Sequence, residues 1–188
     1  MSKRPSRWAA ELLQVWFHDL SPSDWFGQNG PEASDTVDQM LRIKFERKLV
    51  ALGGERPDHF TGNPKVAQAA ILLFDQVPRN IYRGDPRAFA TDPLARELCK
   101  AVIAKGWDTD LSGSERQFIA MPLMHSEDVA DQAASVAYFA EHLPDNLGFA
   151  KSHHEMIARF GRFPHRNTAL GRETAEAEQA AIDEGFSW

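Results

Sequence analysis

Cysteine and long hydrophobic runs are what this sequence has least of. Cys99 is the single cysteine in 188 residues, so an internal disulfide is excluded, and this low usage fits the cytosol. No apolar run approaches the length that spans a membrane. Residues 1–20 begin with basic side chains but lack an uninterrupted apolar core, which predicts an amphipathic helix and not a signal peptide. We therefore expect a cytoplasmic protein without a membrane partner.

An excess of positive charge is also missing. With 21 Lys and Arg against 27 Asp and Glu, the formal net charge is -6 at pH 7. Such a chain exerts no general electrostatic attraction on nucleic acid or on an anionic membrane. Arginines interleaved with Tyr82, Phe160 and Phe163 are compatible with stacking on single strands, but the acidic balance opposes it. The composition therefore argues against a nucleic-acid partner.

The sequence also lacks the patterns of strands, repeats and familiar catalytic motifs. No run alternates β-branched and polar residues as a strand would, and no clean internal repeat marks a helical solenoid. There is no glycine-rich phosphate loop, no nucleophile elbow and no linker or low-complexity segment. We therefore expect an all-α fold and a single domain over residues 1–188.

Apolar residues at helical spacing run through most of the chain. They predict roughly eight helices joined by short loops, a pattern typical of antiparallel helix pairs. Pro122 is predicted to end or kink one of these helices. The predicted starts are Ser6, Ser34 or Asp35, Asn63 (as the cap before Pro64), Asp92, Ser114, Ser126, Asp145 or Asn146, and Thr174. In the helix after Ser126, the residues predicted to face inward are Val129, Ala133, Val136 and Phe139.

Three segments mix polar side chains with large apolar ones too closely to be ordinary surface. The first segment is FDQVPRNIYRGDPRAFATD, residues 74–92, and the second is MPLMHSEDVADQ, residues 121–132. The third is RFGRFPHRN, residues 159–167, extended by HHE at 153–155 and by Gly171-Arg172. Since the arginines of the first and third segments need acceptors, and the second supplies carboxylates, we expect the three segments to converge in space.

Two interpretations of these segments remain open. One is a structural network of ion pairs that fixes how the helices cross. The other is a site for a small anion, phosphate or carboxylate, with His165 or His125 as the general acid or base if chemistry occurs. The candidate ligand-binding residues are Arg79, Asn80, Arg83, Arg162, Arg166, Asn167, Asp75, Glu127 and Asp128. The sequence indicates neither a reaction nor a cofactor.

The third segment carries the most specific expectations. Its Gly-Phe-Pro sequence predicts a tight turn after a helix, with Arg159 anchoring that turn and Arg162, His165 and Arg166 available for the ligand. A metal site is not predicted, because no HExxH motif, facial-triad spacing or cysteine pair is present. The possible metal ligands are His125, His153, His154, His165, Glu127 and Glu155.

Five blocks also resemble a known family. They are LLFDQVPRNIYRG (72–84), AFATD (88–92), MPLMHSED (121–128), RFGRFPHRN (159–167) and LGR (170–172). In these blocks, and over nearly the whole chain, the sequence resembles the mainly bacterial proteins catalogued as domain of unknown function 924. The resemblance implies a helical fold similar to tetratricopeptide-repeat proteins, and no activity, because none is established for the family. By analogy of fold alone, a non-catalytic protein or peptide interaction module is the alternative to an anion-binding protein.

Overall fold

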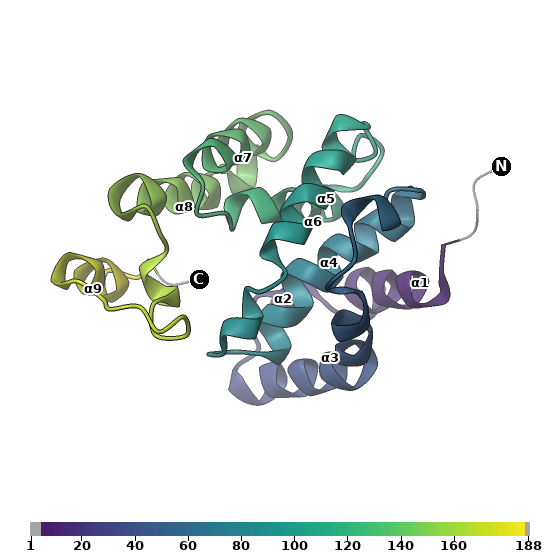
Figure 1. Cartoon of the computed structure of the whole chain (residues 1–188), viewed down its shortest axis with the longest axis horizontal. Helices are drawn as coiled ribbons and strands as arrows, with labels where there is room; N and C mark the ends of the chain where they lie inside the picture. The colour runs from purple at the N-terminus through teal and green to yellow at the C-terminus, as the bar shows by residue number, and fades with distance from the viewer. Residues whose placement is uncertain (1–4, 187–188) are drawn as a thin grey trace. The chain divides into compact units, whose positions relative to one another are not determined.

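The structure is a computed structural model that describes residues 5–186. Lys3 and Arg4, the basic start of the predicted N-terminal helix, lie outside the described residues. Nine α-helices and no strand occur in the described part of the chain, which confirms the all-α class (Figure 1). The chain divides into two compact units. Of the described residues, the first unit comprises 5–83 and 87–119, and the second comprises 84–86 and 120–186.

The helices begin close to most of the predicted residues. Their bounds are α1 Arg7–Gln14, α2 Pro22–Trp25, α3 Pro31–Leu52, α4 Pro64–Ile81, α5 Asp92–Ala104, α6 Gly113–Met124, α7 Val129–His142, α8 Leu147–Phe160 and α9 Glu176–Asp183. Asn63 caps α4 as predicted, since its side chain accepts hydrogen bonds from the backbone N–H groups of Lys65 and Val66. Short α2, whose cap Ser21 exchanges hydrogen bonds with Asp24, was not predicted.

Helix α4 is the centre of the first unit. It packs against α1, α3 and α5, and most of its side chains are buried. Pro78 has no N–H, so the carbonyl of Phe74 lacks its usual helical donor. The hydroxyl of Thr91, the residue before α5, donates to that carbonyl at 2.7 Å. The proline thus leaves an acceptor that connects the start of α5 to the middle of α4.

The predicted starts of α3 and α6 are wrong. Helix α3 begins at Pro31 instead of Ser34 or Asp35, because Gly30 adopts a φ of 92° and Pro31 occupies the first helical position. Helix α6 is capped by Ser112 and not by Ser114: the Ser112 Oγ accepts from the N–H of Glu115 at 3.3 Å, and the Glu115 carboxylate accepts from the N–H of Ser112 at 3.1 Å. The helix then continues through Pro122 to Met124, so it does not end at this proline.

Helix α7 was predicted with the wrong cap and with the wrong face buried. Asp128, not Ser126, caps the helix by accepting from the N–H groups of Ala130 and Asp131. Of the four residues predicted to face inward, Phe139 is buried, but Val129 is 59% exposed and Ala133 is also exposed. The buried residues of α7 are Asp131, Gln132, Ser135, Tyr138 and Phe139.

Hydrogen bonds explain why a polar face of α7 can be buried. The Ser126 hydroxyl donates to the Asp131 carboxylate at 2.8 Å. The Gln132 amide donates to the carbonyls of Met124 and Ser126 at 2.6 and 2.7 Å. Burial of polar groups is tolerated when they are hydrogen-bonded in this way, so apolar periodicity alone misplaced the inner face. In the second unit α7 packs on α8, and a separate apolar cluster forms around Met156, Ile157, Phe163 and Ala181.

Candidate functional site

Arg79 of the first polar segment is a largely buried structural partner within the first unit. It donates to both carboxylate oxygens of Asp92 at 2.8 and 2.9 Å, and to the backbone carbonyl of Asp75 at 2.6 Å. The carboxylate of Asp75 lies 3.3 Å from the same guanidinium and is fully buried. Burial alone would lower the pKa of Arg79, but the charges of Asp75 and Asp92 outweigh it and raise this pKa above its usual value. Arg79 and Asp75 therefore fit the structural interpretation.

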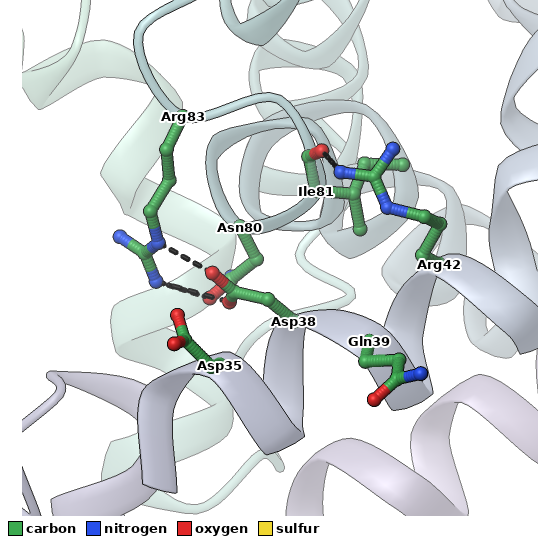
Figure 2. Close-up of a pocket in the computed structure, with 7 residues that line it drawn as sticks. All are labelled: Asp35, Asp38, Gln39, Arg42, Asn80, Ile81 and Arg83. Atoms are coloured by element: carbon green, nitrogen blue, oxygen red, sulfur yellow. Dashed lines mark hydrogen bonds and ion pairs between the residues drawn. The ribbon is translucent and has the colours of Figure 1, made fainter. Parts of the chain in front are cut away.

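Arg83 and Asn80 line a depression of about 320 Å³ at the end of α4 (Figure 2). Arg83 donates to the two oxygens of Asp38 on α3 at 2.5 and 3.0 Å and to the Asn80 side-chain oxygen at 3.0 Å. Thus Arg79 and Arg83 both find acceptors inside the first unit. The residues lining the depression are Asp35, Asp38, Gln39, Arg42, Asn80, Ile81 and Arg83.

Sequence reasoning missed the α3 side of this depression. Asp35, Asp38, Gln39 and Arg42 are spaced i, i+3, i+4 and i+7, so they share one face of the helix. That spacing was visible in the sequence. It was overlooked because a polar face on a helix is usually a solvated surface and carries no apolar periodicity.

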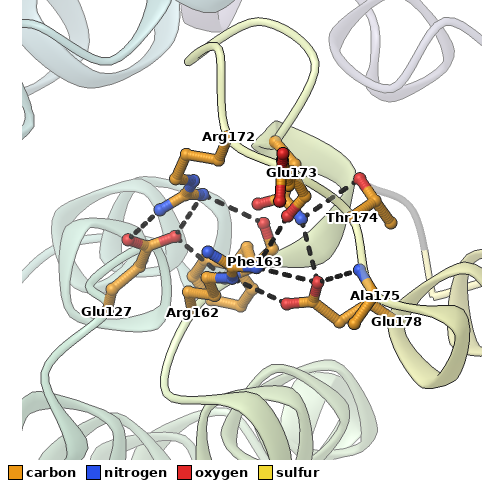
Figure 3. A network of polar contacts seen from close by, with 9 residues as sticks. Glu127, Arg162, Phe163, Arg172, Glu173, Thr174, Ala175 and Glu178 are labelled. Atoms are coloured by element: carbon orange, nitrogen blue, oxygen red, sulfur yellow. Dashed lines mark hydrogen bonds and ion pairs between the residues drawn. The ribbon is translucent and has the colours of Figure 1, made fainter.

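In the second unit, Arg162 connects the turn after α8 to α9 (Figure 3). Its guanidinium donates to the two oxygens of Glu178 at 2.6 and 2.9 Å and to the carbonyl of Glu173 at 2.9 Å. The hydrogen bond from Arg162 lowers the pKa of Glu178 to about 2, against the opposing effect of burial. The Asn167 amide and the Ala175 N–H also donate to Glu178, at 3.2 and 2.8 Å. Arg162 and Asn167 therefore hold the turn in place.

Glu127 connects the second and third polar segments in the same network. Its two oxygens accept from Arg172 at 3.0 Å each, and one also accepts from the N–H of Phe163 at 2.8 Å. Burial raises the pKa of Glu127, but the hydrogen bonds from Arg172 and Phe163 outweigh it, and the pKa is lowered overall. The predicted convergence is thus present for these two segments. Glu127 acts in it as a structural acceptor, as Asp128 acts as a helix cap.

Arg159 does not anchor the turn as predicted. Its nearest carboxylate is that of Glu155, one helical turn earlier at 3.5 Å, and both side chains are largely exposed. Gly161 ends α8 with a φ of 69°, so the chain reverses direction and Arg162, beyond the reversal, reaches Glu178 instead.

We expect Arg162→Ala to lower the melting temperature, because it leaves the nearly buried Glu178 carboxylate without its arginine. The matched variant Arg159→Ala should leave the melting temperature almost unchanged, since exposed pairs contribute little. Differential scanning calorimetry of both variants measures the difference. Equal effects would mean that the Arg162–Glu178 pair does not stabilise the turn.

Two histidines and one arginine contact Phe163, and a third histidine lies beside one of them. The ring centroid of Phe163 lies 5.6 Å from those of His153 and His165, and the His125 ring lies 6.2 Å from His153. Arg166, which is 6% exposed, stacks over Phe163 at 4.5 Å and donates to the carbonyl of His125 at 2.9 Å. These residues form a cluster that we call the Phe163 cluster. His125 and His165, the two predicted proton carriers, therefore lie in one place.

His153 is the buried member of the Phe163 cluster. Because the Phe149 carbonyl can only accept, the Nδ1 of His153 donates to it, at 2.9 Å. Burial, followed by the nearby charge of His125, lowers the pKa of His153 to about 3. The ring is therefore neutral at physiological pH. Among the described residues, no three His, Cys, Asp or Glu side chains are placed to hold a metal ion together.

Comparison with known proteins gives a family and a related structure. A family model described as "Bacterial protein of unknown function (DUF924)" matches residues 12–185. The solved structure of a protein of unknown function from Agrobacterium tumefaciens is similar, with a TM-score of 0.84 and 33% sequence identity. The match covers 94% of this chain and 97% of that one. No curated protein matches the chain. None of the described helices is both long and apolar enough to cross a membrane.

Proposed function

The chain belongs to this bacterial family of unknown function, and we propose that its second unit binds a small anion, phosphate or carboxylate, at the Phe163 cluster. The observation that carries the proposal is that Arg166 and His165 lie against one aromatic ring, while Arg166 also donates to the backbone carbonyl of His125. A guanidinium with imidazoles beside it is suited to phosphate and carboxylate oxygens, and an aromatic wall limits access of water. His125 and His165 are both partly exposed, so a ligand in solvent can reach them.

The network around the cluster supports this assignment by supplying rigidity. Arg162 and Arg172 are paired with Glu178 and Glu127, so these two arginines serve the structure of the turn. The short 3-10 helix Pro164–Arg166 that carries the basic residues is held between these pairs. A binding group gains precision when its supporting contacts fix its position before the ligand arrives. If a reaction takes place at the site, His125 and His165 are the groups that hold or move a proton.

Thermal stability in the presence of anions tests this proposal. We expect sodium phosphate or sodium succinate to raise the melting temperature above that in sodium chloride of the same ionic strength. At a ligand concentration of 100 times Kd, one bound anion adds about 2.7 kcal/mol to the free energy of unfolding. His165→Gln and His125→Gln should reduce this gain, whereas His154→Gln, on the same helix as His153, should keep it. An equal gain in all four proteins, or no gain over chloride, would refute the proposal.

A second candidate is a non-catalytic protein or peptide interaction module, the function found for tetratricopeptide-like arrays by analogy of fold. The exposed side of α7 favours it, because this side is apolar and made of small residues. Its members are Val129, Ala130, Ala133, Ala134, Ala137 and Ala140. Such a module would bind through this surface and would show no specific response to phosphate or succinate.

A further inference from the structure

The depression between α3 and the end of α4 has a different chemistry from the Phe163 cluster. We propose that it binds a short zwitterionic peptide, with the ammonium group at Asp35 and the terminal carboxylate at Arg42. Asp35 and Asp38 supply two carboxylates, and Arg42 and Arg83 supply two guanidiniums, so the formal charges of the lining balance. A balanced lining with separated charges favours a ligand that carries both charges over a simple anion or cation.

Helix geometry separates the two charged ends by a defined distance. Asp35 and Arg42 are seven residues apart on the same face of α3, which corresponds to about 10 Å along the helix axis. Asp38 lies between them and is already paired with Arg83 (Figure 2). A free amino acid, whose charged groups are next to each other, is too short to reach both Asp35 and Arg42. An extended tripeptide spans roughly 10–11 Å and matches this spacing.

Both proposed contact groups have capacity for a ligand. Among residues 5–186, the carboxylate of Asp35 makes no hydrogen bond or ion pair, and this residue is exposed. The side chain of Arg42 is 48% exposed, and its Nη2 donates to the carbonyl of Ile81. This bond fixes the guanidinium at the depression. The Arg42 contact with Glu46 is 3.7 Å, long for a hydrogen bond, so N–H groups remain for a ligand carboxylate.

The walls of the depression can bind the peptide backbone between its charged ends. Gln39 and Asn80 bring side-chain amides, which donate to and accept from peptide groups. The Asn80 Nδ2 already donates to the Gln76 carbonyl at 3.0 Å, so this amide has a fixed orientation. No large apolar side chain other than Ile81 lines the depression. Recognition would therefore depend on the charged termini and not on one particular side chain.

Blocked peptides test the proposal directly. The probes are tri-L-alanine, its N-acetyl derivative and its C-terminal amide, titrated into the full chain and followed by NMR chemical shifts and by calorimetry. We expect the free tripeptide to bind and each blocked form to bind about five- to tenfold more weakly, since each loses one charge-assisted contact. Equal affinity for the free and blocked peptides would overturn the proposal, as would the absence of binding by the free tripeptide.

Variants of exposed residues locate the two contacts. Asp35→Asn should weaken binding of the free tripeptide but leave the already weak binding of the N-acetyl form unchanged. Arg42→Gln should weaken binding of the free tripeptide but leave the already weak binding of the C-terminal amide unchanged. The charge-matched controls are Glu97→Gln on α5 and Arg47→Gln on α3, both exposed residues that do not line the depression. Because the Asp35 side chain is exposed and makes no polar contact among the described residues, Asp35→Asn still tests the proposal if Arg42→Gln lowers stability. If Asp35→Asn and Arg42→Gln weaken peptide binding no more than the two controls do, the peptide binds elsewhere.

Discussion

Arg79→Ala is expected to lower the free energy of unfolding by about 3–5 kcal/mol, the usual result of removing one partner from a buried ion pair. The substitution would remove the Arg79 guanidinium from beside the fully buried Asp75 carboxylate and would also remove both hydrogen bonds to Asp92. Urea unfolding at pH 7, followed by far-UV circular dichroism, measures the loss. For a chain of this size the melting temperature should fall by roughly 10 °C.

Arg83→Ala provides the matched control, four residues away. Arg83 also pairs with an aspartate through two nitrogens, but its side chain is 58% exposed, against 19% for Arg79. Its removal should cost only about 0–1 kcal/mol, as for other exposed pairs. A second variant, Asp75→Asn in the Arg79→Ala background, should recover part of the loss because it removes the stranded charge. A loss below 1 kcal/mol for Arg79→Ala would contradict the structural role of this pair.

Local signals in the sequence predicted the helices well where the start of a helix depends on its own residues. Asn63 followed by Pro64 is an example, since cap and first turn are chosen by chemistry within four residues. The buried face of α7 could not be predicted in the same way. Its polar residues are buried because Ser126 and backbone carbonyls receive their hydrogen bonds, and those partners are defined only by the folded chain.

The sequence predicted which segments contribute to the candidate site, but not which arginine would pair with which carboxylate. Complementary charge correctly placed Glu127 of the second segment near the third. It could not show that the acceptor of Arg162 would be Glu178, which lies in α9, outside the three polar segments. Nor could it show that Arg83 would bind Asp38, 45 residues earlier. Each choice depends on which helices pack together, and many carboxylates in the sequence were equally suitable.

The arginines of the polar segments therefore fall into two groups, and the structural interpretation accounts for one of them. Arg79, Arg162 and Arg172 are paired with carboxylates through two nitrogens or with buried acids, as expected of groups that fix the fold. Arg166 lies on an aromatic ring, donates to the backbone carbonyl of His125 and acts by its charge on Glu127. A turn held by paired arginines thus presents the residues of our proposed anion site.

His153 is expected to make the protein less stable as the pH falls from 6.5 toward 3. Its ordinary pKa is 6.5, and burial with the nearby charge of His125 lowers it to about 3 in the folded chain. Between these two values the unfolded chain binds a proton that the folded chain excludes, so protonation favours unfolding. The loss is about 1.4 kcal/mol for each pH unit in this range, or about 3 kcal/mol between pH 6.5 and 4.5.

His153→Phe removes the group that binds this proton while keeping a flat ring of similar size beside Phe163 and His125. The variant loses the hydrogen bond to the Phe149 carbonyl, and we expect it to differ little from the wild type at pH 7.5, since one such bond contributes about 1 kcal/mol. At pH 4.5 it should be the more stable of the two proteins, with a flatter dependence of unfolding free energy on pH. His154→Gln, at the next position of α8 and only partly buried, should follow the wild-type curve.

Urea unfolding at a series of pH values compares the pH dependence of the unfolding free energy in the three proteins. Because carboxylates titrate equally in all three, their contribution cancels in the differences. Parallel curves for the wild type and His153→Phe would mean that the buried imidazole accepts a proton in the folded chain as readily as in the unfolded one.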